Sequence, residues 1–184
     1  MLLKLILLMS LNVVTIEEFY QFMKTYYGSK AIREVQKEYS LSHIPRPMAL
    51  LIEHEGYTTG EYLDDKGIPT KGVGQTGIFI NMPFPQVYEK FLGLARSLTP
   101  QFNHLPEEAQ GAILLATYRG DWSMSRRTRK LFDQGKYQEA SKEFLNNKEY
   151  NERKMKNPQD GVVKRLEYIA QVIASLEENK EENT

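Results

Sequence analysis

The stretch that decides the fold runs from Glu55 to Gly74 and reads EGYTTGEYLDDKGIPTKGVG. Glu55 closes an apolar helical run, and a second carboxylate, Asp64, comes before a turn that contains glycine. A hydroxyl follows at Thr70, and glycines end the stretch. This order predicts a packed helix that ends at Glu55 and then a short β-hairpin around the turn at Asp64.

The two carboxylates are expected to lie in different surroundings. Cleavage of a glycosidic bond usually needs one protonated and one ionised carboxyl group, one on either side of the bond. Glu55 follows the apolar run 48–52, so the end of the helix dipole and a low dielectric favour its protonated form. Asp64 belongs to a polar turn that faces water. The asymmetry suits an acid at Glu55 and a base at Asp64.

This stretch resembles the phage-type lysozymes, the muramidases and endolysins of double-stranded DNA phages. That family has a helix-ending Glu-Gly, then Tyr, Asp, a Gly turn, Thr and Gly-x-Gly. The chain keeps every interval, at Glu55-Gly56, Tyr62, Asp64, Gly67, Thr70 and Gly72-Val73-Gly74.

The resemblance implies a role for each polar residue of the stretch. By it, Glu55 is the general acid, Asp64 orients or activates the attacking water, and Thr70 helps to hold that water. It also implies inversion at the anomeric carbon, or at least no obligatory covalent intermediate. One departure is Gln75, where the family often has a supporting His. Any one of these elements alone occurs in many hairpin-containing domains, whereas six in register within one short stretch are much stronger evidence.

Composition narrows the function further. The chain has 184 residues, 24 Lys and Arg, 24 Asp and Glu, and no cysteine. We therefore expect one domain with an appendage, no disulfide, no thiolate metal site and no nucleic-acid partner. No cofactor is expected, and His43, His54 and His104 are too isolated for a zinc site. Charge is local, with a basic run at 126–130 and an acidic run at 177–182. The basic run is either a solvated helix face or a surface that meets the cell wall.

The expected fold is α+β and mostly helical: a two-lobed, lysozyme-like domain with a small sheet at the cleft. We expect residues 1–44 to form an N-terminal apolar and helical extension, 45–176 the catalytic domain, and 177–184 an acidic, frayed tail. The apolar segment 1–14 is an uncleaved export or anchor segment, an arm docked on a partner, or a local packing element, and docking is narrowly favoured. Gly28 is expected to end one helix before a second at 30–39.

Apolar periodicity predicts the remaining helices. Prolines open helices at 45–47 and 85, a nearly all-apolar helix begins near 105, and Gly135 separates two further helices. A last helix is expected to be capped by Asp160 and to bury an apolar face that includes Val162. Pro69 is expected at an edge position.

Tyr118 and Arg119 are candidate substrate contacts, because an aromatic and a polar residue precede Gly at the cleft end of the central helix in the family. Arg119 would bind sugar hydroxyls or a peptide carboxylate, or else pair with a local acid. Trp122, the only tryptophan, is a core residue more often than a sugar platform, in a ratio of roughly two to one.

The predicted function is cleavage of the β-1,4 bond between N-acetylmuramic acid and N-acetylglucosamine in bacterial peptidoglycan, for phage entry or bacteriolytic release. The expected location is the phage virion (tail-associated), or the host cytoplasm or periplasm acting on the wall. Residues 1–44 would contact other phage structural proteins. The chain has no His-Glu-x-x-His motif, which argues against a zinc amidase, and no Gly-x-Ser-x-Gly motif, which argues against a serine hydrolase. The remaining alternative is a structural virion protein that keeps the fold without turnover.

Overall fold

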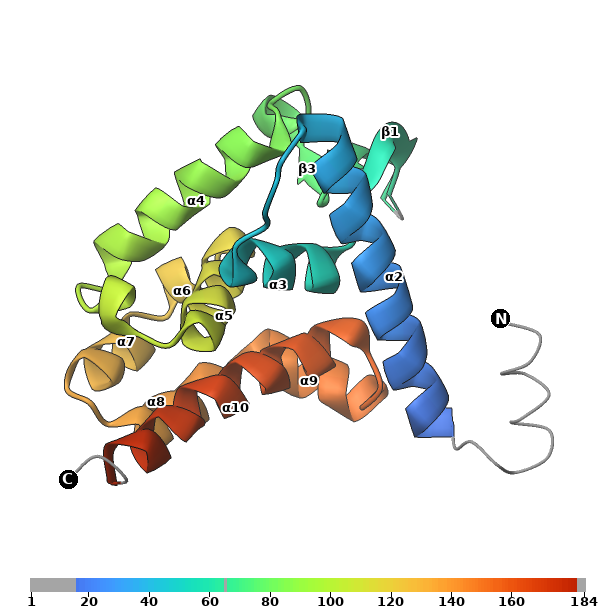
Figure 1. Cartoon of the computed structure of the whole chain (residues 1–184). Coiled ribbons are helices and arrows are strands. Elements are labelled where there is room, and N and C mark those ends of the chain that lie inside the picture. The colour runs from blue at the N-terminus through green and yellow to red at the C-terminus, as the bar shows by residue number, and fades with distance from the viewer. Residues whose placement is uncertain (1–15, 65, 182–184) are drawn as a thin grey trace. The chain divides into compact units, whose positions relative to one another are not determined.

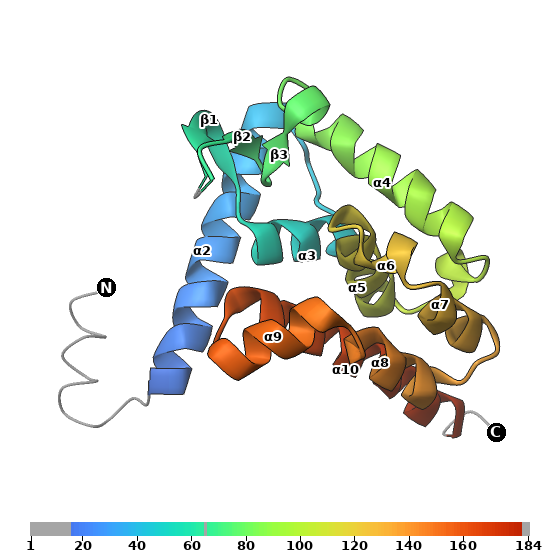
Figure 2. The same cartoon turned by 180° about the vertical axis from the view of Figure 1, so that it is seen from behind.

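The structure is a computed structural model that describes residues 16–64 and 66–181 (Figures 1 and 2). Its elements are mostly helices, with one small antiparallel sheet, which confirms the mostly helical α+β class. The chain divides into two compact units. Unit 1 contains the chain through Ile44 together with Ile52–Ile80, and unit 2 contains Pro45–Leu51 and the chain from Asn81 onward. The apolar segment 1–14 lies outside the described residues.

Unit 1 begins with a long helix, α2 (Ile16–Tyr39), which is continuous where the sequence predicts a break at Gly28. That prediction is wrong for a packing reason. Gly28 is buried, and a Cβ added to it would lie 3.0 Å from Cγ of Glu53. Gly28 is therefore the point where helix α3 approaches α2, and a glycine inside a helix costs only about 1 kcal/mol.

Tyr57 ties the end of α2 to the chain that follows α3. Its hydroxyl donates a hydrogen bond of 2.7 Å to Oε2 of Glu38 and lies 3.3 Å from the hydroxyl of Tyr39. Burial raises the pKa of Tyr57, and the contacts with Tyr39 and Glu38 raise it further. The phenol therefore stays protonated and keeps its donor at neutral pH.

Helix α3 (Arg46–Glu55) has Pro47 in its first turn, as predicted. Its first half, through Leu51, is part of unit 2, where a Cβ on Gly111 would lie 2.3 Å from Cδ1 of Leu50. Gly111 thus permits close packing of α3 on α5. The helix ends as the backbone N–H of Gly56 donates to the carbonyl of Ile52 at 2.8 Å, with Gly56 in the left-handed region at φ 77°.

The sheet of unit 1 has the order β1-β2-β3 and is antiparallel throughout. Its strands are β1 (Thr58–Leu63), β2 (Pro69–Gly72) and β3 (Gln75–Thr76), and a 3₁₀ turn, η1 (Gly77–Phe79), follows. Tyr62 pairs with Thr70, which confirms the predicted hairpin. Pro69 pairs only with Leu63 of β1, so it has the predicted edge position although β2 is the central strand. Proline is tolerated there since it is the first residue of the strand and pairs only with β1.

Unit 2 is a set of helices around the buried helix α5. The later elements are α4 (Phe84–Leu98), η2 (Phe102–His104), α5 (Glu107–Tyr118), α6 (Asp121–Met124), α7 (Arg126–Asp133), α8 (Tyr137–Leu145), α9 (Lys148–Lys156) and α10 (Gly161–Glu181). Residues 111–117 of α5 are all buried, as the apolar sequence predicts. Figures 1 and 2 both show α10 alongside α8.

Trp122 is in the core of unit 2 and is therefore not available to a sugar. Its indole N–H donates a hydrogen bond of 2.9 Å to Oγ1 of Thr99, and both residues are buried. Its ring meets Phe132 edge-on, with centroids 5.4 Å apart. A second polar link joins three helices: Arg46 donates through Nε and Nη2 to the carboxylate of Glu108, which also accepts from the hydroxyl of Tyr168.

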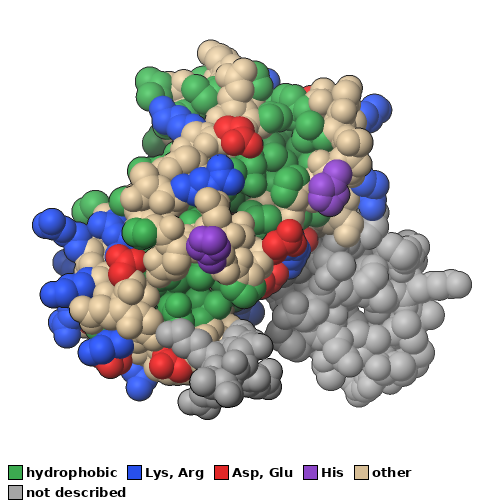
Figure 3. Space-filling model, turned by 60° about the vertical axis from the view of Figure 1, so that its left-hand side comes forward, with side chains coloured by type: hydrophobic (Ala, Val, Ile, Leu, Met, Phe, Trp, Pro, Cys, Tyr) green, Lys and Arg blue, Asp and Glu red, His purple; other side chains and the backbone are tan. Residues whose placement is uncertain are grey.

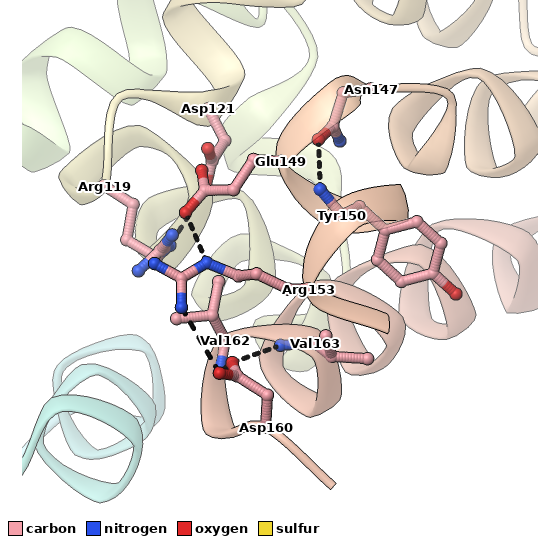
Figure 4. Close-up of polar contacts among 9 residues, drawn as sticks. All are labelled: Arg119, Asp121, Asn147, Glu149, Tyr150, Arg153, Asp160, Val162 and Val163. Carbon is pink, nitrogen blue, oxygen red and sulfur yellow. Dashed lines mark hydrogen bonds and ion pairs between the residues drawn. The ribbon is translucent and has the colours of Figure 1, made fainter. Parts of the chain in front are cut away.

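Helix α9 is polar and was not predicted from apolar periodicity. Local caps and ion pairs stabilise it, together with a hydrogen bond from the hydroxyl of Tyr150 to Glu167 of α10. The side chain of Asn147 accepts from the backbone N–H of Tyr150 at the N-terminus, and Arg153 donates to Glu149 one turn away at 2.9 Å. Arg153 also reaches Oδ2 of Asp160 at 3.2 Å, as Figure 4 shows.

Asp160 caps helix α10 as predicted, since its Oδ1 accepts from the backbone N–H groups of Val162 and Val163. The buried face of α10 contains Val163, and Val162 is only half-buried. The helix continues to Glu181, into the segment predicted to be an acidic tail. Within residues 16–64 and 66–181, no helix is both long enough and apolar enough to cross a membrane.

Candidate active site

Glu55 is the last residue of α3, as the sequence predicts, and the left-handed Gly56 turns the chain away from the helix immediately after it. The side chain of Glu55 is half-buried. Two residues later the chain enters β1, whose Thr58 pairs with Gly72 of β2. The helix end and the hairpin are therefore joined by a very short connection within unit 1.

Asp64 sits in the hairpin turn between β1 and β2 and organises that turn. Its Oδ1 accepts two hydrogen bonds of 2.8 Å, from the backbone N–H groups of Lys66 and Ile68. Its own backbone N–H donates to the carbonyl of Ile68 at 3.0 Å, and its carbonyl accepts from Gly67. Oδ2 receives no hydrogen bond from any residue that the structure describes. One carboxylate oxygen is thus fixed by the backbone, and the other keeps its capacity to accept.

Thr70 and Asp64 are both bonded to the backbone of the same residue, Ile68. The hydroxyl of Thr70 donates a hydrogen bond of 2.9 Å to the carbonyl of Ile68, whose N–H is bound to Asp64. Thr70 is 3% exposed, so the hydroxyl is held in one orientation. Because the hydroxyl proton is used by the carbonyl, the lone pairs of Oγ1 are the part of the group that can still bind a water.

The sequence predicts that Glu55 is shielded from water and that Asp64 is exposed. In the structure both residues are half-buried, so this prediction of different exposure is wrong. Asp64 differs from Glu55 in that two backbone N–H groups donate to its carboxylate. The sequence predicted a polar turn at Asp64 but not these two hydrogen bonds. Glu55, Asp64 and Thr70 all belong to unit 1.

Gln75 replaces the histidine that the resemblance leads one to expect, and it has a structural role. It is 4% exposed, and its Nε2 donates a hydrogen bond of 2.8 Å to the carbonyl of Phe79. A Cβ on Gly72 would lie 2.1 Å from Oε1 of Gln75, and Gly72 has a φ of 62°. Gln75 therefore packs into the space that Gly72 leaves, which holds the turn between β2 and β3 against η1. Sequence reasoning missed this role.

Tyr118 and Arg119 lie at the end of α5, in unit 2. The ring of Tyr118 packs edge-on against Phe91, with centroids 4.9 Å apart. Nε of Arg119 donates to Oδ2 of Asp121 at 3.0 Å, and both side chains are less than a quarter exposed. Pairing with a local acid, one of the two predicted roles for Arg119, is therefore present (Figure 4).

No group of three or more His, Asp or Glu side chains in the described part of the chain is arranged to hold a metal ion. The chemistry that this site offers is that of two carboxyl groups and a hydroxyl. Comparisons of the chain with protein-family models, with curated proteins and with solved structures give no match.

Proposed function

We propose that this chain is a glycoside hydrolase that works with two carboxyl groups and no cofactor. Within that class, the residues support a muramidase, which cleaves the β-1,4 bond between N-acetylmuramic acid and N-acetylglucosamine in peptidoglycan. The motif from Glu55 to Gly74 is the support for this substrate class. The same motif is the support for a phage-type, lysozyme-like fold.

The observation that carries the proposal is the arrangement around Ile68. Its N–H fixes Oδ1 of Asp64, and its carbonyl fixes the hydroxyl of Thr70. Asp64 and Thr70 are thereby both held by the backbone of one residue, and Oδ2 of Asp64 and Oγ1 of Thr70 keep the capacity to accept. A water that donates one proton to each acceptor keeps a lone pair for attack on the anomeric carbon.

The proton balance of the reaction follows from these roles. Glu55, protonated at the start, gives its proton to the leaving glycosidic oxygen as the bond breaks. The water attacks from the opposite face, and Asp64 receives the proton that the water loses. Thr70 positions the water without changing its own protonation. Attack by water without a covalent intermediate inverts the configuration at the anomeric carbon.

The test is clearing of Gram-negative cells stripped of their outer membrane, together with the release of reducing sugar from purified peptidoglycan. Glu55→Gln keeps the shape of the side chain and removes the acid, so we expect a loss of at least ~100-fold. Glu53→Gln, on the same helix and also half-buried, is the matched control and should clear like the parent. Near-parental clearing by Glu55→Gln contradicts the mechanism.

The second candidate is a virion structural protein with this fold and no turnover. Its support is that α2, which is not part of the motif, is bonded to Tyr57, two residues after Glu55. Absence of clearing by the parent, together with detection of the chain in purified virions, would favour it. Detection in virions along with clearing would favour a particle-borne enzyme over an endolysin released at the end of infection.

A further inference from the structure

Helix α7 (Arg126–Asp133) has two chemically opposite faces. Successive residues of an α-helix are rotated by about 100°, so Arg126, Lys130 and Arg127 fall within an arc of about 100°. The buried residues of the helix, Thr128 and Phe132, lie close together on the other side. The three cationic residues are all exposed. We call Arg126, Arg127 and Lys130 the α7 cationic face.

Arg129 belongs to the basic run in the sequence but not to this face. Its Nη1 donates to the backbone carbonyls of Trp122 at 2.8 Å and Ser123 at 2.9 Å. It therefore closes the C-terminus of α6 and has a structural role. The structure thus divides a run that looks uniform in sequence into one structural cation and three at the surface.

Two of the three surface cations form no ion pair with a described residue, and the third forms a weak one. Arg127 is 77% exposed and 3.6 Å from Glu143, a distance at which an exposed ion pair contributes little. Arg126 and Lys130 form no ion pair with any residue in the described part of the chain. All three are therefore able to bind an external anion.

The α7 cationic face lies within a larger basic region. Residues 119–156 contain 11 Lys and Arg and six Asp and Glu, a formal net charge of +5 in a chain whose total is zero. Figure 3 shows Lys and Arg side chains gathered on one side of the space-filling view. Beside Arg127, a surface hollow is lined by Lys142 of α8 but also by Glu139 and Glu143, so the unbalanced positive charge is on α7 itself. This polarity directs an anionic polymer toward unit 2.

We infer that the α7 cationic face binds the carboxylate-bearing stem peptides of peptidoglycan, an inference that rests on the proposed function. The face spans little more than one helical turn, about 6 Å, which is too short for the row of phosphates that a nucleic-acid-binding protein neutralises. It matches instead the small, separated carboxylates of short peptides, which arginine binds through paired donors. Stem peptides cover the whole wall, so the face retains the enzyme on its substrate between cleavage events.

The experiment measures cosedimentation of Glu55→Gln protein with purified peptidoglycan sacculi that have been freed of other anionic polymers. Adding Arg126→Gln, Arg127→Gln and Lys130→Gln should weaken binding about tenfold at about 50 mM salt, and the difference should vanish near 1 M. The matched control removes the same charge outside residues 119–156, with Lys30→Gln, Lys37→Gln and Lys90→Gln, all exposed, and should bind within about twofold of the parent. Amidation of the stem carboxylates should remove the difference between the two triple variants.

Equal binding by the two triple variants, or binding that survives amidation unchanged, overturns the inference. If the α7 triple variant shows no melting transition by circular dichroism, it has not folded, and Arg126→Lys with Arg127→Lys replaces it. This double variant keeps the charge and should bind sacculi like the parent. Failure of this inference is separable from failure of the proposed function, because binding by Glu55→Gln needs no cleavage. Clearing by the parent with no effect of the α7 substitutions removes only the docking surface.

Discussion

The backbone N–H of Ile68 donates a hydrogen bond of 2.8 Å to Oδ1 of Asp64, and this contact makes the carboxylate part of the turn. Lys66 adds a second donor to the same oxygen. The functional and the structural contributions of Asp64 can therefore be measured separately, because an amide oxygen accepts the same two bonds without carrying the charge.

Asp64→Asn is expected to keep the turn and lose activity. The melting temperature should stay within a few degrees of the parent, while clearing and reducing-sugar release fall by at least ~100-fold. Glu61→Gln, an exposed carboxylate on β1 in the same hairpin, is the control and should retain activity. A fully active Asp64→Asn protein would remove Asp64 from the mechanism, and an inactive one that has also unfolded would show only that the turn needs an acid.

Gly72→Ala is expected to be more destabilising than Gly74→Ala. Both glycines have positive φ, 62° and 85°, so each alanine meets backbone strain of about 1–2 kcal/mol. Only at Gly72 does the new Cβ also meet a neighbour, Oε1 of Gln75, and overpacking adds about 1–3 kcal/mol.

Chemical unfolding measures both costs. Combining Gly72→Ala with Gln75→Ser, which removes the clashing atom, should bring its cost down toward that of Gly74→Ala. Additive free energies in this double-mutant cycle would show that Gln75 is not the cause.

Thr99→Val leaves the indole N–H of Trp122 buried without its acceptor. The free energy of unfolding should fall by about 1–3 kcal/mol, as for other unsatisfied buried donors. Thr117→Val is the matched control, because Thr117 is equally buried but donates to the carbonyl of Ile113, which keeps its helical bond. Its cost should stay below about 1 kcal/mol. Equal losses for the two variants would argue that the Trp122 bond adds nothing beyond packing.

Asp160 predicts a pH dependence of stability. The backbone N–H of Val162 is the main cause that holds the pKa of this carboxyl below its ordinary value of 3.8, and Val163 and Arg153 lower it further. A depressed pKa stabilises the fold above the ordinary value, and this contribution is lost as the pH falls through the folded-state pKa. Asp160→Asn, which still caps the helix, should melt a few degrees below the parent near pH 6 and at the same temperature near pH 2. A difference that is constant with pH would exclude the charge as its source.

The sequence predicted features that depend on neighbours in the chain. The helix end at Glu55, the pairing of Tyr62 with Thr70 and the cap at Asp160 all follow from local pattern, and the structure has them. Gly28 could not be read correctly, because its reason is the approach of Glu53 from another helix. Helix α9 was missed because it has no apolar periodicity: caps, ion pairs and a polar contact with α10 stabilise it.

In the candidate site, the residue types and the turn could be predicted from the sequence. The backbone hydrogen bonds that hold Asp64 and Thr70 could not. The role of Ile68 depends on its backbone, which any residue would supply, so no side-chain pattern marks it. Gln75 stood out only as a departure from a family pattern. A long polar side chain opposite a glycine of positive φ is the signal that would have found its role.

The hydrogen bonds from Tyr57 to Glu38 and Tyr39 limit where the chain can be truncated without loss of stability. A recombinant fragment that starts at Pro45 would begin at the helix of the proposed acid, yet it would strip Tyr57 of both partners and uncover the side of α3 at Glu53 that meets Gly28. The C-terminal half of α2 is thus part of the support of the hairpin and not a removable tag, and a truncation that removes it should be judged first by solubility.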